Sequence, residues 1–264
     1  MSDYATTMKR YERKGLVIQA HQNVVTVTLN RIAKRNSFDE PMMQGMIQLF
    51  EDPPAAARCI ILTGSESTFC AGADLTWMAN NPDRTTSAFV ARLFESVRTC
   101  RLPVIARVNG PAIGGGVGLT ACCDVAVATD QAFFQLSEVR VGILPAVISP
   151  FVMEKIGPGR LRQWMLTAQR IDASAAAGWG LIAESVPEEQ LDETIHRYLS
   201  MILTGAPHAQ TEAKKLAARL YGLYERTLLD ETIDLIAALR ASDEAQQRMA
   251  AFLDSKSHGK EDRS

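Results

Sequence analysis

Two turns rich in small residues carry the pattern in this chain that is most suggestive of chemistry. The first reads F-C-A-G-A-D-L at 69–75, and the second reads G-G-G-V-G-L at 114–119. Glycine and alanine let a ligand approach the main chain without interference from a side chain. Two fixed N–H donors directed at one point in a dry pocket stabilise a negatively charged oxygen. The pair of turns therefore predicts an oxyanion hole, which a thioester carbonyl needs when it becomes an enolate.

A single glutamate follows the second turn. Glu138 lies in an apolar neighbourhood, L-S-E-V-R-V-G at 136–142, just beyond a predicted strand. Desolvation at such a position raises the pKa of a carboxyl group towards the range that proton transfer requires. The alternative is a surface glutamate paired with Arg140, and the local sequence does not decide between the two. Asp74 has a simpler interpretation, since an aspartate there can cap a helix that starts near Leu75.

The glycine run has two other interpretations. A glycine-rich loop between a strand and a helix can bind phosphate, but this run matches neither G-x-G-x-x-G nor G-x-x-x-x-G-K-[ST]. Close packing of a helix on a sheet is the second alternative. The interpretation we favour is a helix N-terminus whose free N–H groups and positive dipole end face a developing oxyanion.

Composition limits the class of protein. The chain has 264 residues, 47% of them hydrophobic and 22% charged, with a net charge of −2. This describes one large domain, or one domain with a small appendage, without general attraction to nucleic acid or acidic membranes. No apolar run approaches the roughly 18 residues of a membrane span, and the N-terminus lacks a signal-peptide pattern. We therefore expect a cytoplasmic protein with neither nucleic acid nor a membrane as a partner.

Cysteine and histidine usage gives no metal pattern. An odd number of cysteines, five, without framework spacing indicates reduced thiols. Cys122 and Cys123 are adjacent rather than spaced as C-x-x-C, and the four histidines are scattered. We therefore predict no metal site.

Hydrophobic periodicity predicts an α/β protein. Short strands are expected over 16–20, 24–29, 59–63, 104–109, 125–128 and 132–135, with helices over 41–51, 86–100 and 114–121. Their alternation predicts βαβ units with right-handed crossovers. After about residue 145 the strand signal fades, and helices are expected over 150–156, 158–167, 173–178, 187–203, 210–223 and 228–253.

Taken together, these segments resemble the crotonase (enoyl-CoA hydratase/isomerase) superfamily over residues 13–255. The supporting motifs are L-N-R…N-S at 29–37, C-D-V-A-V-A at 123–128 and L-T-A…I-D-A…A…G-L at 166–181. The resemblance implies a crotonase-like ββα spiral core, which we place at 1–200, and a C-terminal helical region at 201–264 that covers CoA and mediates oligomerisation. It also implies a homohexamer, a dimer of trimers, that acts on an acyl-CoA thioester. No separate cofactor is expected, because coenzyme A is part of the substrate.

The resemblance also assigns residues. In the family, two backbone N–H groups form the oxyanion hole, and they map onto Ala73 and Gly115; with Glu138 these are the predicted catalytic residues. The predicted substrate-binding positions adjoin these turns, with two basic residues where the family meets the CoA phosphates: Lys34, Arg35, Ala71, Gly72, Asp74, Leu75, Gly114 and Gly118.

The chain departs from the family at one catalytic position. Hydratases of the family typically carry two glutamates, and the first of these positions is Gly118 here, so that only Glu138 remains. One carboxylate can serve hydration if another group holds the water. A single glutamate can instead shuttle a proton between C2 and C4, as in the family's enoyl-CoA isomerases. A catalytically impaired CoA-binding homologue is a third possibility.

Three local sequence motifs resemble those of one bacterial branch of the family. The segments 71–78, 114–124 and 136–152 look like those of hydratases for 3-methylglutaconyl-CoA and isohexenylglutaconyl-CoA, which serve leucine and acyclic-terpene degradation. Because these substrates carry a distal carboxylate, a basic group is expected near the acyl end, and Arg92 and Arg140 are candidates.

Three further segments are candidates for the acyl pocket. Residues 80–86 are predicted to form a flexible loop that is part of a lid. Val147 and Ile148 are expected to shape the acyl pocket, whereas Trp77 and Met78 either pack in the core or form a wall of the pocket.

Overall fold

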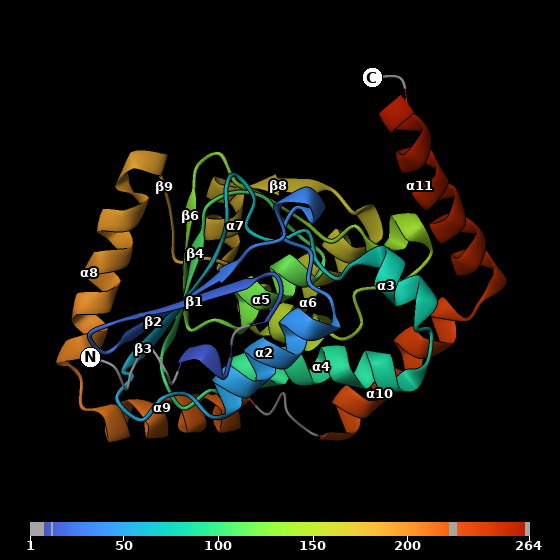
Figure 1. The fold of residues 1–264 in the computed structure, drawn as a ribbon. Helices are drawn as coiled ribbons and strands as arrows, with labels where there is room; N and C mark the ends of the chain where they lie inside the picture. Colours follow the sequence, from blue (N-terminus) through green and yellow to red (C-terminus); the bar gives the residue numbers. More distant parts are fainter. Residues whose placement is uncertain (1–7, 12, 222–225, 262–264) are drawn as a thin grey trace.

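The computed structural model describes residues 8–11, 13–221 and 226–261 of the chain (Figure 1). Its main element is a six-stranded sheet in the order β1-β2-β3-β4-β6-β9. The hairpin β1–β2 is antiparallel, and every other neighbouring pair in this sheet is parallel. The strands span Leu16–His21, Val24–Leu29, Cys59–Gly64, Val104–Val108, Val125–Thr129 and Glu184–Val186.

The central strand β3 shows why the sheet is buried on both faces. All six residues of C-I-I-L-T-G are buried, as expected for a parallel strand covered on both sides. Ile60 and Leu62 belong to the large core on one face, whereas Ile61 belongs to a smaller core on the other. Figure 1 shows α8 (Leu191–Thr204) along the second face, where Leu191 and Ile195 complete the smaller core.

A second, three-stranded sheet has the order β5-β7-β8. These strands are short and span Ala112–Ile113, Phe133–Gln135 and Arg170–Asp172. The sequence patterns predicted β7 but neither β5, β8 nor β9. Strands of two or three residues are too short for an alternation to be recognised, and they form here because neighbouring segments supply their partners.

The remaining helices surround the sheets and connect the strands. They are α2 (Glu40–Glu51), α3 (Leu75–Asn80), α4 (Arg84–Thr99), α5 (Gly115–Cys122), α6 (Ser149–Thr167), α7 (Ala173–Trp179), α9 (Pro207–Tyr221), α10 (Arg226–Arg240) and α11 (Asp243–Glu261), with 3-10 turns η1 (Ile32–Lys34), η2 (Glu138–Val141) and η3 (Glu188–Gln190). Two charged contacts attach helices to the core. Arg98 of α4 pairs with Glu154 of α6, both nearly buried. Lys214 of α9 donates to the Asp124 carboxylate at 2.7 Å.

The C-terminal helices pack against elements of their own chain. α10 runs along α4 with Ile233 and Ile236 buried (Figure 1). α11 contacts α3 and η2, and its Ala245 is buried against Gly142. The prediction of a single helix over 228–253 is wrong, because a turn at Ala241 and Ser242 separates two helices.

One other boundary differs from the sequence predictions. The predicted loop 80–86 is shorter, since only 81–83 lie outside helices, and Asp83 caps α4 by accepting from the Thr86 N–H at 2.8 Å. The prediction of separate helices over 150–156 and 158–167 is confirmed, because Gly157, with a φ of +75°, is not helical and divides α6 into two. Residues 222–225, within the expected helices or between them, lie outside the described residues.

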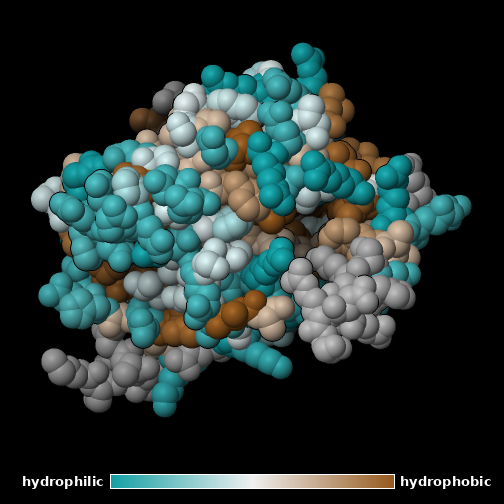
Figure 2. All heavy atoms as spheres, turned by 90° about the horizontal axis from the view of Figure 1, so that it is seen from above, coloured by the Kyte–Doolittle hydropathy of each residue, from teal (hydrophilic) through white to brown (hydrophobic). Residues whose placement is uncertain are grey.

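Hydrophilic and hydrophobic residues are interspersed on one face of the molecule (Figure 2). Seen from above, hydrophobic residues form separate patches among hydrophilic ones (Figure 2). In the described part of the chain no helix is both long enough and apolar enough to cross a bilayer.

The contact between α5 and the first turn leaves no room for a side chain. A Cβ on Gly116 would lie 2.2 Å from the main-chain oxygen of Cys70. We predict that Gly116→Ala lowers the free energy of unfolding by about 1–3 kcal/mol, because backbone cannot yield as a flexible side chain can. Gly159→Ala is the matched control, since nothing lies within 4 Å of its Cβ position. Chemical denaturation of both variants tests this, and equal stabilities would contradict it.

Candidate active site

The first turn leaves one N–H group without an acceptor. Phe38 and Ala73 form an isolated parallel bridge. The Phe38 N–H donates to the Gly72 carbonyl at 2.9 Å, and the Asp74 N–H donates to the Phe38 carbonyl at 2.9 Å. Because a trans peptide directs its C=O and N–H to opposite sides, the Ala73 N–H is directed away from Phe38. It donates to no group in the described chain.

The second turn also leaves one N–H group without an acceptor. Gly114 has φ +53° and ψ −117°, a conformation that residues with a side chain rarely adopt. Its N–H donates to the Gln135 carbonyl at 2.8 Å, which fixes the turn to β7. α5 begins at Gly115, whose N–H, like others in a first helical turn, has no intrahelical acceptor. No hydrogen bond from this N–H to the described residues is present.

The structure brings the two turns side by side. The Ile113 N–H donates to the Cys70 carbonyl at 2.9 Å. A Cβ on Gly72, which has φ +86°, would lie 3.0 Å from the nitrogen of Gly115, and a Cβ on Gly115 would lie 3.3 Å from the Cα of Gly72. The two N–H groups therefore belong to backbone segments in van der Waals contact. An oxyanion hole needs two such donors close together.

Glu138 stands over the second turn. It begins η2, and its Oε1 lies 3.0 Å from the position of a Cβ on Gly114. Its Oε2 is buried and has no hydrogen-bond partner among the described residues. Burial raises the pKa of Glu138 from its ordinary value of 4.5 to about 7. Such a carboxyl group can both accept and donate a proton near neutral pH.

The alternative interpretation of Glu138 as a surface ion pair is wrong. Arg140 donates its Nη2 to the carbonyl of Ala168 at 2.9 Å instead. Arg92 pairs with Glu51 at 2.7 Å on the exposed side of α4. Both arginines proposed for a distal carboxylate are therefore engaged elsewhere.

Asp74 holds the first turn in place. Its Oδ1 accepts from the Thr76 N–H at 3.0 Å and so caps α3, while its Oδ2 accepts from Arg31 Nη2 at 3.0 Å. Burial alone would raise the pKa of Asp74, but the hydrogen bond from Arg31 and the charge of Lys34 outweigh it, and the pKa is lowered. Asp74 is therefore an ionised anchor immediately after Ala73.

The other predicted binding residues surround this anchor. Lys34 is 52% exposed, and its Nζ lies 3.7 Å from Asp74 Oδ2. Arg35 acts through its main chain, because its carbonyl accepts from the Ala71 N–H at 3.0 Å. Leu75 begins α3 directly after Asp74. The sequence analysis did not identify Phe38, which pairs with Ala73 through a backbone bridge. The position of Phe38 directly after the N-S motif could have indicated this role.

The space beside Gly118 is filled by hydrocarbon. A Cβ on Gly118 would lie 2.4 Å from Ile148 Cγ2 and 2.8 Å from Phe94 Cε1. Phe94 packs edge-on against Phe38, with ring centroids 6.2 Å apart. At this position the site therefore presents an apolar wall.

The described residues near the two turns include neither an ionised cysteine nor a cluster of metal ligands. Cys70 is buried beneath the first turn, and burial raises its pKa to about 12, so that its thiol stays protonated. Within the described ranges no group of three or more His, Cys, Asp and Glu side chains could hold a metal ion.

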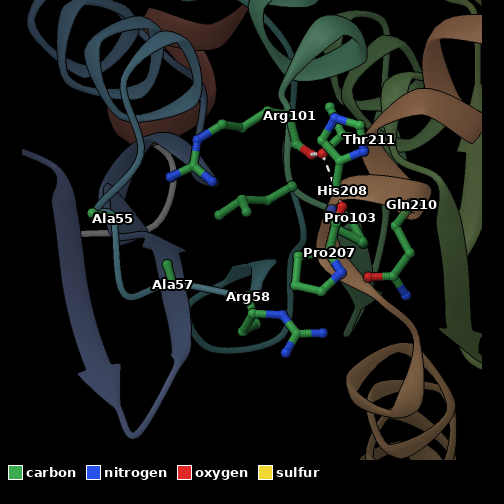
Figure 3. A pocket seen from close by; sticks show the side chains of 10 residues that line it. Ala55, Ala57, Arg58, Arg101, Pro103, Pro207, His208, Gln210 and Thr211 are labelled. Atoms are coloured by element: carbon green, nitrogen blue, oxygen red, sulfur yellow. Dashed lines mark hydrogen bonds between the residues drawn. The ribbon is translucent and has the colours of Figure 1, made fainter.

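A separate cavity of about 260 Å³ lies away from these residues (Figure 3). It adjoins the amino ends of β3 and β4, whereas the two small-residue turns follow the carboxyl ends. Figure 3 shows the side chains of Arg58 and Arg101 extending in different directions. Arg58 donates to the Gly205 carbonyl at 2.7 Å, and Arg101 donates to the carbonyls of Pro53 and Pro54 at 3.1 Å.

Comparisons with known proteins agree with this site. The family described as enoyl-CoA hydratase/isomerase matches residues 19–262. A probable enoyl-CoA hydratase of Mycobacterium tuberculosis is 31% identical over 90% of this chain and 95% of its own length. The 2,3-dehydroadipyl-CoA hydratase of Escherichia coli is 30% identical over 90% of this chain and 95% of its own length. The crystal structure of an enoyl-CoA hydratase from Mycobacterium avium superposes with a TM-score of 0.80 at 30% identity, covering 92% of this chain and 98% of that chain.

The fold, the paired turns and these matches define a protein of the crotonase superfamily. The chain belongs to the enoyl-CoA hydratase/isomerase family. Its two sheets and helical C-terminal region are the mixed α/β crotonase fold that the motifs predicted, and that prediction is confirmed.

The raised pKa of Glu138 has a consequence for stability. Between pH 4.5 and about 7 the folded protein retains a proton that the unfolded chain releases, so that stability falls as pH rises. Above about pH 7 the loss is constant, at most about 3 kcal/mol. We therefore expect Glu138→Gln to be more stable than the wild type at pH 8. The difference should shrink towards pH 4.5, as thermal melting across this range can show. A difference independent of pH would contradict the buried, unpaired state.

Proposed function

We propose that this chain is an enoyl-CoA hydratase in which Ala73 and Gly115 stabilise the enolate oxygen and Glu138 transfers the proton. The observation that carries the proposal is the buried, unpartnered Glu138 Oε2 at a backbone crossing where two N–H groups also lack acceptors. Unpaired polar groups are costly in a folded protein. The two N–H groups gain a partner when a thioester carbonyl occupies the site, and Glu138 Oε2 gains one when a water molecule binds beside the neighbouring carbons.

The reaction follows from these groups. The two N–H donors polarise the thioester carbonyl, which makes C3 electrophilic. The ionised Glu138 takes a proton from water as the water oxygen bonds to C3, and negative charge moves to the carbonyl oxygen between Ala73 and Gly115. The protonated Glu138 then returns a proton to C2. A pKa near 7 suits both steps, because neither protonation state of Glu138 is strongly disfavoured.

For the substrate we propose a branched glutaconyl-type enoyl-CoA, either 3-methylglutaconyl-CoA or isohexenylglutaconyl-CoA, in leucine or acyclic-terpene catabolism. This substrate class is supported by the amino-acid sequence of three segments, 71–78, 114–124 and 136–152. The relative named 2,3-dehydroadipyl-CoA hydratase carries a name that denotes a dicarboxylic thioester. We further propose a cytoplasmic homohexamer, with a core at 1–200, a C-terminal region at 201–264, and no cofactor besides the CoA of the substrate.

A second candidate is an enoyl-CoA isomerase that uses the same residues. The apolar wall of Ile148 and Phe94 beside Gly118 favours it, because the atoms nearest to that position are hydrocarbon and cannot hydrogen-bond to a water. Turnover in D₂O enriched in ¹⁸O separates the two. ¹⁸O in the acyl product supports hydration, whereas deuterium exchange at C2 and C4 without ¹⁸O supports isomerisation. Crotonyl, 3-methylcrotonyl, 3-methylglutaconyl and isohexenylglutaconyl thioesters, followed by loss of the conjugated chromophore, test the substrate class.

Glu138→Gln is the direct test of the catalytic role. The amide keeps the shape of the side chain but cannot accept a proton, so we expect kcat to fall at least about 10²-fold. The matched control is Glu95→Gln on the exposed side of α4, which should keep its activity. Steady-state assays of both variants decide the matter, and near-wild-type turnover by Glu138→Gln would refute the assignment.

A further inference from the structure

One arginine is buried in a position that the reaction does not use. Arg240, at the end of α10, is 1% exposed. Its Nη2 donates to the main-chain carbonyls of Met78 and Asn81, at the end of α3, and its Nη1 lies 3.5 Å from Ser87 Oγ in α4. Its Nε is buried and has no acceptor in the described part of the chain.

Arg240 also lacks an anionic partner. No carboxylate whose side chain the structure describes forms an ion pair with it. The charge of Asp83 acts on it, but that carboxylate caps α4. Burial lowers the pKa of Arg240, yet a guanidinium remains charged at neutral pH. Burying an unpaired cation is costly, and the carbonyls at the end of α3 offset only part of the cost.

Two helices lead from Arg240 to the oxyanion donors. α3 begins directly after Ala73 and Asp74 and ends at the carbonyls that Arg240 binds. Its six residues span about 9 Å. One end of α3 therefore adjoins the first oxyanion donor, and the other end adjoins Arg240.

The second helix is α4, which Arg240 contacts at Ser87. Ser87, Ala91 and Phe94 are buried and share one face of α4, because residues three and four apart align on a helix. Phe94 touches the wall beside Gly118 and packs on Phe38, which adjoins Gly115. The buried stripe of α4 thus leads from Arg240 at Ser87 to the second oxyanion donor.

We infer that Arg240 binds the distal carboxylate of a dicarboxylic acyl-CoA and so determines substrate specificity. The inference rests on the proposed function and deepens it. A five-carbon diacid has four carbon–carbon bonds of about 1.5 Å between its carbonyl carbons. With one charge-assisted hydrogen bond of about 2.8 Å, its extended reach matches the length of α3. The bound carboxylate supplies the anion that the buried guanidinium lacks.

A purely structural role for Arg240 is the competing explanation, since it also ties α10 to α3. The two roles differ in what they predict for ligands that differ only in the distal carboxylate. A structural tie affects all acyl-CoA thioesters alike, whereas a carboxylate receptor changes the ratio between them.

Calorimetric binding of saturated thioesters to the full-length protein tests this. Glutaryl-CoA is compared with pentanoyl-CoA, and adipyl-CoA with hexanoyl-CoA, so that each pair shares its chain length. We expect the wild type to bind at least one diacid thioester about 10- to 100-fold more tightly than its partner. Arg240→Gln should reduce that ratio to about one, and Arg240→Lys should retain part of it. Arg84→Gln, which removes exposed pairs between α4 and α10, is the control and should keep the ratio.

The outcomes distinguish this inference from the proposed function. Saturated thioesters cannot be hydrated, so binding is measured apart from catalysis. A wild type without preference for diacids, or a parallel loss of affinity for both members of a pair in Arg240→Gln, overturns the role of Arg240. Thermal melting confirms that each variant is folded. A diacid preference without turnover of any enoyl-CoA would contradict the proposed reaction and leave the role of Arg240 intact.

Discussion

The site depends on two short backbone bridges. Cys70 pairs with Ala112, and Phe38 pairs with Ala73, so that three segments distant in sequence lie side by side. Phe38 pairs with one side of the first turn, and the Ala73 N–H on the other side has no acceptor among the described residues. The Gly115 N–H has none because Gly115 starts α5, and the bridge between Cys70 and Ala112 brings that helix start beside the first turn. This is preorganisation by backbone geometry, with no side chain that has to adopt a rotamer.

Glycines at 114, 115 and 116 allow this approach for different reasons. Gly114 needs its conformation to turn from β5 into α5. Gly115 and Gly116 need the absence of a Cβ, because Phe38 and the Cys70 carbonyl occupy that space. The interpretation of the glycine run as a site of close helix packing is therefore correct for Gly115 and Gly116. Close packing is what places the amide of Gly115 beside the first turn.

The sequence predicted more of the site than of its surroundings. The small-residue turns, the caps and the long strands rest on local chemistry, so Glu138, Asp74 and β3 were recognisable from their neighbours alone. The short strands β5, β8 and β9 depend on partners far along the chain, and local patterns cannot show them. The filling of the Gly118 position was also hidden, because Ile148 and Phe94 come from other elements.

In the C-terminal helices, local patterns likewise fail to predict where a charged side chain lies. Periodicity predicted an amphipathic helix near 228–253, but it does not reveal that Arg240 lies on the buried side. An arginine in a sequence favours a solvent-exposed face, and here burial follows from the carbonyls that α3 presents at its end. α3 is anchored at its start by Asp74, which is itself fixed by Arg31. One arginine therefore acts at each end of α3, and the helix links the oxyanion turn mechanically to the C-terminal region. A substrate that contacts both ends of α3 would bind where an arginine fixes each end of the helix.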